Sequence, residues 1–223
     1  MINEKMYALG SKRSIIREIF EYCKIRAAEI GADKVFDFSI GNPSVEPPIE
    51  ISEAIVDLIN NEKGVALHGY TSAQGDFGVR DSIAKETNAK FGTSLTADNL
   101  YMTCGAAASL TVSLHAICLP GDEVIALAPF FPEYRPFAEA NGAKLVVVPA
   151  DTSAFQINMD ALAQRITPNT QGIIINSPNN PSGVVYTRQT LQQLSELLLS
   201  KSEEYGHPIY IISDEPYREL VYG

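Results

Sequence analysis

The sequence has few basic residues and no basic run. Only 17 Lys and Arg stand against 27 Asp and Glu, which gives this 223-residue chain a net charge of -10. A surface with this balance repels nucleic-acid phosphates and anionic lipid headgroups. We therefore expect neither nucleic acid nor a membrane among its partners.

Cysteine, histidine and long apolar runs are scarce as well. The three cysteines (Cys23, Cys104 and Cys118) and the three histidines show no spacing typical of metal ligands. An odd number of scattered thiols indicates reduced cysteines, as in a reducing compartment. The N-terminus is charged where a signal peptide is apolar, and no later run reaches the roughly 18 residues of a membrane span. We expect a cytoplasmic protein without a metal site.

The apolar residues that are present follow helical and strand patterns in turn. Their spacing predicts helices from Ser14 to Gly31, over residues 51–59 and from near Gln74 to Gly92. Farther along the chain, predicted strands at 99–103, 123–128, 144–149, 172–177 and 209–213 alternate with predicted helices at 106–118, 132–141, 159–165 and 188–205. This order predicts an α/β fold, with a mostly parallel sheet and helices on both faces.

Segments rich in small, polar or aromatic residues follow four of the predicted strands. Ligands of parallel sheets bind outside the carboxyl ends of the strands, so we expect these segments to form one site. Asp214 is the most informative residue among them, because a carboxylate at the end of a dry strand loses hydration energy unless a cation or hydrogen-bond donors meet it. Arg218 is an alternative partner for this carboxylate. The four segments are 103–109, 129–134, 178–183 and 214–217.

Three residues in these segments have chemistry that suits a ligand. Gly105 opens a helix whose first N–H groups can hold a phosphate, although a glycine there also serves as a simple tight turn. Phe131 can cover a flat ligand or lie in the core. Asn180 precedes Pro181 and can direct its amide into the site or belong only to a loop. No dinucleotide or P-loop glycine motif occurs, so the phosphate would belong to another kind of ligand.

Six segments together resemble the class I and II aminotransferases of the pyridoxal-phosphate fold type I superfamily. They are SIGNPSVEPP at 39–48, GYTSAQGDFGVRDSIA at 69–84 with Val79 in place of the usual leucine, TCGAAASL at 103–110, APFFPEY at 128–134, NNPSG at 179–183 and SDEPYREL at 213–220. They occur in the order of the family over nearly the whole chain. The resemblance implies an N-terminal arm with part of a small domain at 1–45, and an incomplete cofactor-binding large domain at 46–223.

The resemblance implies catalytic roles for Asp214 and Tyr217. Asp214 would pair with the protonated ring nitrogen of pyridoxal 5'-phosphate and keep the ring cationic, as an electron sink requires. Tyr217 and Asn180 would hydrogen-bond the oxygen on the ring. The other implied binding residues are Gly105, Ala106 and Ala107 for the phosphate, Tyr70 for the phosphate of the neighbouring subunit in a homodimer, Phe131 on the ring face, and Gly41 and Asn180 at the substrate carboxylate.

The activity that the resemblance implies is amino transfer between an L-amino acid, aspartate by default, and a 2-oxo acid such as 2-oxoglutarate. The Schiff-base lysine of the family would lie beyond the Asp-x-x-Tyr motif, and the last lysine here, Lys201, lies in the polar end of a helix. We therefore expect this chain to be a piece of a longer enzyme, or a degenerate relative, without turnover by itself. Two alternatives stay open: another reaction on the same cofactor, such as that of a β-lyase or a decarboxylase, and a non-catalytic ligand-binding module.

Overall fold

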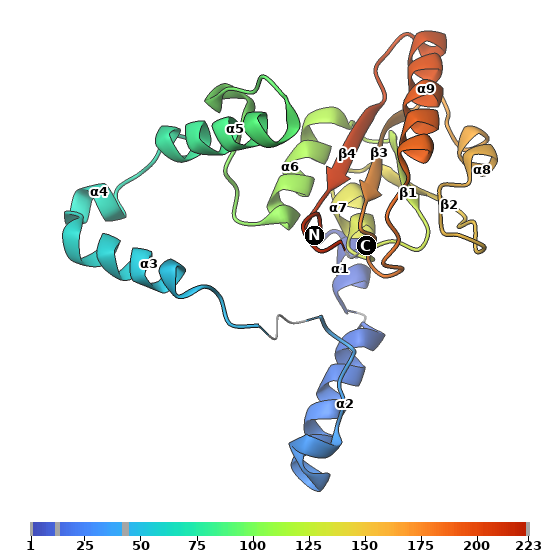
Figure 1. The fold of residues 1–223 in the computed structure, drawn as a ribbon. Coiled ribbons are helices and arrows are strands. Elements are labelled where there is room, and N and C mark those ends of the chain that lie inside the picture. The colour runs from blue at the N-terminus through green and yellow to red at the C-terminus, as the bar shows by residue number, and fades with distance from the viewer. Residues whose placement is uncertain (1, 12–13, 42–44, 222–223) are drawn as a thin grey trace. The chain divides into compact units, whose positions relative to one another are not determined.

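The computed structural model describes residues 2–11, 14–41 and 45–221. Residues 42–44, which belong to the segment at 39–48 singled out above, lie outside this description. The chain forms two units, Met1–Met102 and Thr103–Gly223, each with its own internal packing (Figure 1). The domain boundary near residue 45 stays a prediction.

The first unit is helical. Its α2, α3 and α5 confirm the three helices predicted in this part of the sequence. Gly31 and Gly92 follow α2 and α5 with φ of 100° and 67°, a backbone conformation that favours glycine at the end of a helix. The helices are α1 (Glu4–Ser11), α2 (Ile15–Ile30), α3 (Ile49–Asn61), α4 (Gly64–His68) and α5 (Phe77–Phe91), with short 3-10 turns η1 (Ala32–Lys34) and η2 (Ala97–Asn99).

Side-chain hydrogen bonds determine where α5 begins and what it is attached to. The Asp76 carboxylate accepts from the backbone N–H of Val79 at 2.9 Å, so the helix begins at Phe77 and not near Gln74. Arg80 is buried, and its guanidinium donates to the carbonyl oxygens of Gly75 and Ala97. The arginine therefore links α5 both to the loop before it and to η2.

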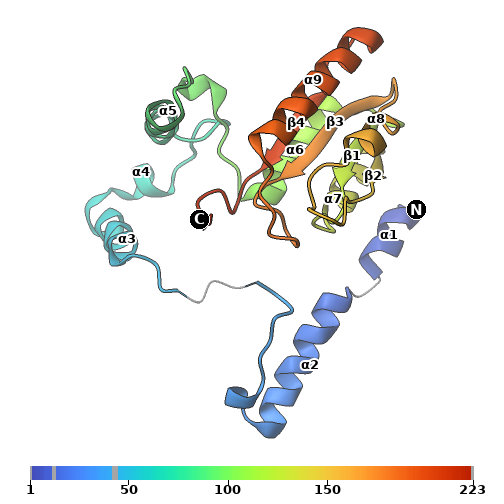
Figure 2. The ribbon, with the colours of Figure 1, turned by 45° about the vertical axis from the view of Figure 1, so that its right-hand side comes forward.

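The second unit is an α/β layer structure. The strands are β1 (Glu123–Leu127), β2 (Lys144–Val148), β3 (Thr170–Asn176) and β4 (Tyr210–Asp214), and they are parallel in the order β2-β1-β3-β4 (Figure 2). The helices are α6 (Ala106–Ile117), α7 (Tyr134–Glu139), α8 (Met159–Ala163) and α9 (Arg188–Tyr205). The predicted fold class is confirmed, because every strand pair is parallel and helices alternate with strands.

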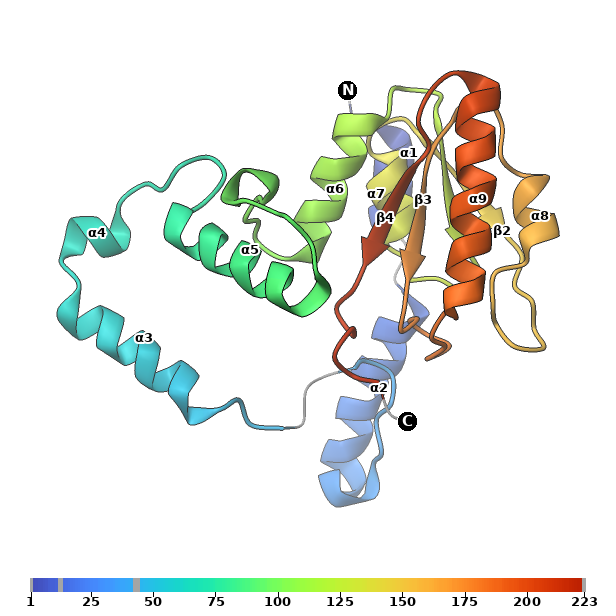
Figure 3. The same cartoon turned by 45° about the horizontal axis from the view of Figure 1, so that its top comes forward.

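The sheet separates two apolar cores. Successive residues of β1 point to opposite faces, so Val124 and Ala126 pack with α6 and α7, whereas Ile125 and Leu127 pack with α8 and α9. We call these the α6–α7 face and the α8–α9 face (Figure 3). Helices on both faces explain why the strands read as continuous apolar runs and not as an alternating pattern.

The strand predicted at 99–103 is wrong. Asn99 ends η2, and the sheet of the described chain has no strand over residues 100–103. The backbone N–H of Met102 donates instead to the carbonyl of Gln74 at 2.9 Å. A strand needs a neighbouring strand for its backbone hydrogen bonds, and an apolar pattern alone does not show whether one is available.

Candidate functional site

The order of the strands places a crevice at the carboxyl edge of the sheet. The loop after β1 leads to α7 on the α6–α7 face, whereas the loop after the neighbouring β3 leads to α9 on the α8–α9 face. Loops that leave adjacent strands in opposite directions open a space between them, where ligands of such sheets bind.

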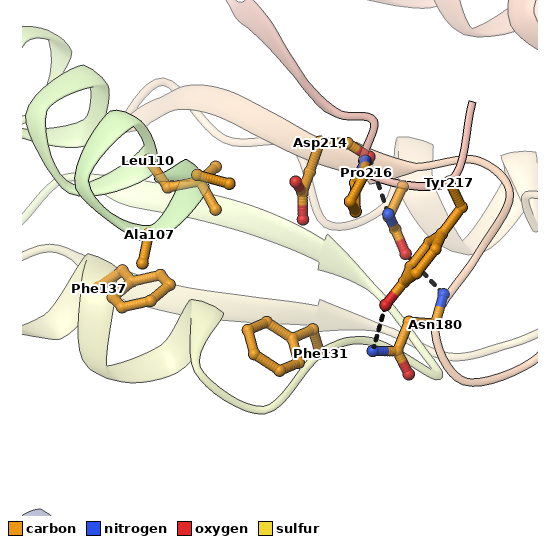
Figure 4. Close-up of a pocket in the computed structure, with 10 residues that line it drawn as sticks. Ala107, Leu110, Phe131, Phe137, Asn180, Asp214, Pro216 and Tyr217 are labelled. Carbon is orange, nitrogen blue, oxygen red and sulfur yellow. Dashed lines mark hydrogen bonds between the residues drawn. The ribbon is translucent and has the colours of Figure 1, made fainter. Parts of the chain in front are cut away.

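A cavity of about 160 Å³ lies at this edge (Figure 4). It is entirely within the second unit. It is enclosed by residues from α6, from the loop after β1, from α7, from β3 and its loop, and from the end of β4 and the turn after it: Ala106, Ala107, Leu110, Phe131, Phe137, Asn176, Asn180, Asp214, Pro216 and Tyr217. Residues that are up to about a hundred positions apart in sequence thus share one cavity.

Asp214 brings a carboxylate to this cavity from the last position of β4. The hydroxyl of Tyr134, a buried residue of α7, donates to Asp214 Oδ2 at 2.6 Å. Burial raises the pKa of Tyr134 far above its usual range, and the hydrogen bond to Asp214 raises it further. The tyrosine therefore stays neutral, and the negative charge of the pair belongs to Asp214.

Asn176 connects the ends of β3 and β4. It is buried at the end of β3, where its Nδ2 donates to the backbone carbonyl of Asp214 at 2.8 Å and its Oδ1 accepts from the backbone N–H of Asn180 at 2.6 Å. The side chain of Asn180 lies next to Tyr217, with 3.4 Å between Nδ2 and the hydroxyl oxygen (Figure 4). One amide thus positions the backbone of two residues that line the cavity.

The N-terminus of α6 gives the cavity an electropositive end. Gly105 precedes the helix with a φ of 95°, and Ala106 and Ala107 line the cavity with exposed small side chains. The first N–H groups of a helix have no partner within the helix, and its dipole favours an anion there. Thr103 also belongs to this turn, because its hydroxyl donates to the carbonyl of Gly105 at 3.1 Å.

Aromatic and aliphatic side chains form the remaining wall. Phe131 and Phe137 are half-buried and pack against the core of the α6–α7 face, beside the buried Leu110. Together with Asp214 and the helix N-terminus, they make a cavity suited to a flat aromatic ligand that is cationic on one side and carries an anionic group on the other.

The structure brings together most of the residues singled out from the sequence. Ala106, Ala107, Phe131, Asn180, Asp214 and Tyr217 all line the cavity, and Gly105 is the residue before Ala106. Gly41 and Tyr70 belong to the first unit, where both are exposed. Arg218, the alternative partner of Asp214, forms ion pairs with Glu215 and Glu219 instead.

Sequence reasoning missed two polar residues of the site, Tyr134 and Asn176, as well as the apolar Phe137. The two polar residues belong to segments that were singled out or lie next to one: Tyr134 ends APFFPEY, and Asn176 is the last residue of β3. A polar residue at the end of an apolar strand was a usable signal for Asn176. Nothing in the sequence near Tyr134 indicates that its hydroxyl meets a carboxylate.

Comparison with known proteins finds a family model and curated relatives that match most of the chain. A family model described as aminotransferase class I and II matches residues 33–223. An aspartate aminotransferase from Streptomyces avermitilis is 30% identical over 201 residues, which cover 90% of this chain and 47% of that protein. An arginine–pyruvate transaminase from Pseudomonas aeruginosa is 31% identical, covering 85% of this chain and 46% of that protein. The chain thus spans about half the length of the curated relatives it matches.

Solved structures of aminotransferases are similar to this chain as well. An amino transferase from Eubacterium rectale has a TM-score of 0.96 and 57% identity, and the match covers 100% of this chain and 56% of that chain. Aspartate aminotransferase from Thermus thermophilus, solved with maleate, has a TM-score of 0.85 and 26% identity, covering 100% and 55%.

Proposed function

The chain belongs to the class I and II aminotransferases, and from this premise we propose that the protein transfers an amino group between an L-amino acid and a 2-oxo acid in amino-acid metabolism. Aspartate and 2-oxoglutarate are the first pair to test, since aspartate aminotransferases from several organisms are among the relatives. The convergence of Asp214, Asn180, Tyr217 and the α6 N-terminus on one cavity is the observation that carries the proposal.

The cavity fits pyridoxal 5'-phosphate, the cofactor on which this family depends. Asp214 offers a carboxylate to a cationic ring nitrogen, and Phe131 offers an aromatic ring to a planar ligand. Asn180 and Tyr217 lie together as hydrogen-bonding groups for an oxygen on the ring. The N-terminus of α6 offers backbone N–H groups to a phosphate.

Each of these residues would have a defined role in the reaction. When bound, the cofactor supplies an electron sink for the α-carbon of an amino acid. Asp214 would hold the proton on the ring nitrogen through an ion pair in a partly dry site. Tyr217 and Asn180 would orient the ring through its oxygen, and Phe131 would exclude water from one face.

A base for the α-proton would come from elsewhere. The residues described around the cavity include no lysine, and the relatives are about twice as long as this chain. We propose that a part of the protein outside residues 1–223 supplies the Schiff-base lysine, which also acts as the base.

Assembly and location are part of the same proposal. Tyr70 is fully exposed in the first unit, which supports a role at the phosphate of a neighbouring subunit in a homodimer. Gly41 is exposed too, as contact with the substrate carboxylate would require. A cytoplasmic location is also part of the proposal. Separately, among the described helices none has the length and apolar character to cross a membrane.

The test uses the full-length protein and an amino-acid panel that includes aspartate, with and without 2-oxoglutarate. Amino transfer produces glutamate only when 2-oxoglutarate is present, whereas a β-lyase produces ammonia and pyruvate without it. Titration with pyridoxal 5'-phosphate, followed by absorbance, measures cofactor binding independently of turnover. Absence of binding, or elimination in place of amino transfer, would contradict the proposal.

A further inference from the structure

Tyr134 is a buried tyrosine held in one orientation by other aromatic rings. Its side chain is 1% exposed in the core of the α6–α7 face. The ring of Phe130 is stacked on it at 6.3 Å between centroids, and that of Phe131 meets it edge-on at 5.7 Å. Such packing leaves the ring few alternative rotamers, so its hydroxyl is a fixed group.

The hydrogen bond from Tyr134 to Asp214 has a defined direction. A carboxylate only accepts, so the hydroxyl donates to Asp214 Oδ2, with 2.6 Å between the oxygens. Burial, and next the hydrogen bond to Asp214, raise the pKa of Tyr134, so the hydroxyl keeps its proton at any pH at which enzymes ordinarily work. Tyr134 is therefore a permanent donor to the site.

The two carboxylate oxygens of Asp214 are consequently not equivalent. Oδ2 accepts from Tyr134, whereas no hydrogen bond within the described part of the chain involves Oδ1. The side chain of Asp214 lines the cavity (Figure 4). A fixed donor on one oxygen limits rotation of the carboxyl group and leaves the other oxygen for a ligand.

We propose that Tyr134 is a positioning residue: it orients the Asp214 carboxylate so that the free oxygen meets the ring nitrogen of the cofactor. This role rests on the proposed function, and Tyr134 acts through Asp214 without lining the cavity itself. The simpler alternative is a core tyrosine whose hydroxyl merely finds a partner. That alternative predicts an effect on stability and none on the cofactor.

Tyr134→Phe in the full-length protein separates these two roles, because it removes one oxygen and keeps the ring. Tyr186→Phe is the matched control, since Tyr186 is also buried, at 7% exposure, but belongs to the core of the α8–α9 face. We expect Tyr134→Phe to raise the Kd for pyridoxal 5'-phosphate about 10-fold, and Tyr186→Phe to change it less than about 2-fold. Thermal unfolding of both apoproteins shows how much of any change reflects stability. An unchanged Kd in Tyr134→Phe, or equal weakening in both variants, would overturn the proposal.

A double-mutant cycle with Asp214→Asn tests whether Tyr134 acts through Asp214. If it does, Tyr134→Phe raises the Kd much less in the Asp214→Asn background than in the wild type. Additive effects in the cycle would show an independent role and refute the positioning proposal.

The same cycle distinguishes failure of this inference from failure of the proposed function. If the wild type does not bind pyridoxal 5'-phosphate, or if Asp214→Asn leaves its Kd unchanged, the proposed function itself fails. If Asp214→Asn weakens binding and Tyr134→Phe does not, only the positioning role fails.

Discussion

At the residue scale, a charged carboxylate in the site is held by neutral donors. Tyr134 donates to the side chain of Asp214, and Asn176 donates to its backbone carbonyl. Neither donor carries a charge, and among the described residues no ion pair involves Asp214. An aspartate held in this way is ready to pair with a cationic ligand.

The first prediction at this scale concerns the charge of Asp214. Asp214→Asn keeps the size of the side chain but removes its charge, so we expect kcat of the full-length protein to fall about 100-fold or more. Glu215→Gln is the matched control. The adjacent Glu215 is exposed, and its ion pair with Arg218 lies at the surface, so loss of its charge should change kcat less than about 2-fold. Steady-state kinetics of both variants checks this, and comparable activity in Asp214→Asn and Glu215→Gln would contradict it.

The second prediction concerns the buried amide of Asn176. Asn176→Ala leaves the carbonyl of Asp214 and the N–H of Asn180 without this partner, so we expect the free energy of unfolding to fall by about 1–3 kcal/mol. Asn141→Ala is the control, because the buried Nδ2 and Oδ1 atoms of Asn141 have no hydrogen-bond partner in the described structure. Removing them should lower the free energy of unfolding clearly less than Asn176→Ala does. Urea denaturation of both variants measures the difference, and equal losses would show that the Asn176 bonds are not the cause.

At the scale of single elements, the starts of the helices have different roles in the two units. In the second unit, the start of α6 faces the cavity and is left open for a ligand. In the first unit, the start of α5 is closed by the carboxylate of Asp76, whereas Ser14 at the start of α2 makes no side-chain bond. Asp and Ser are both residue types that commonly cap helices, but only Asp76 makes a capping hydrogen bond here.

A prediction follows for these two helix caps. Asp76→Ala removes a real capping bond and should lower the free energy of unfolding by about 0.5–2 kcal/mol. Ser14→Ala should leave it nearly unchanged, because no capping bond is lost. Denaturation curves followed by circular dichroism compare the two. A larger loss in Ser14→Ala than in Asp76→Ala would contradict the capping geometry.

At the scale of the whole molecule, the residues that line the cavity suit cofactor binding better than proton transfer. Its polar members are Asn176, Asn180, Asp214 and Tyr217, and no lysine is among the residues that line it. Curated relatives extend over about twice the length of this chain. We therefore expect cofactor binding and turnover to be separable in this chain.

The whole-molecule prediction tests that separation. We expect the 223-residue polypeptide to bind pyridoxal 5'-phosphate weakly and to form no glutamate from aspartate and 2-oxoglutarate, because its cavity lacks a lysine. The full-length protein, assayed in parallel, is the positive control. Glutamate formation by the 223-residue polypeptide at the rate of the full-length protein would refute the expectation.

Prediction from sequence succeeded where the secondary structure of a segment depends on residues that are close to it along the chain. The apolar runs at β1 to β4 and the helical spacing of α6 and α9 report burial locally, so the elements and the α/β class were predictable. The error at residues 99–103 has the same origin, since the pattern was apolar but no strand of the described chain pairs with it. Local periodicity gives no information about a partner strand.

By itself, the sequence determined the order of helices and strands, and it placed Asp214, Asn180 and the Gly105 turn at strand ends or helix starts. Only the tertiary structure decided which of these groups meet. The strand order and the packing of α7 bring the Tyr134 hydroxyl to Asp214 across 80 positions, and β3 brings Asn176 to the same residue across 38. Such pairings depend on how distant elements stack, and burial patterns along the chain do not encode that.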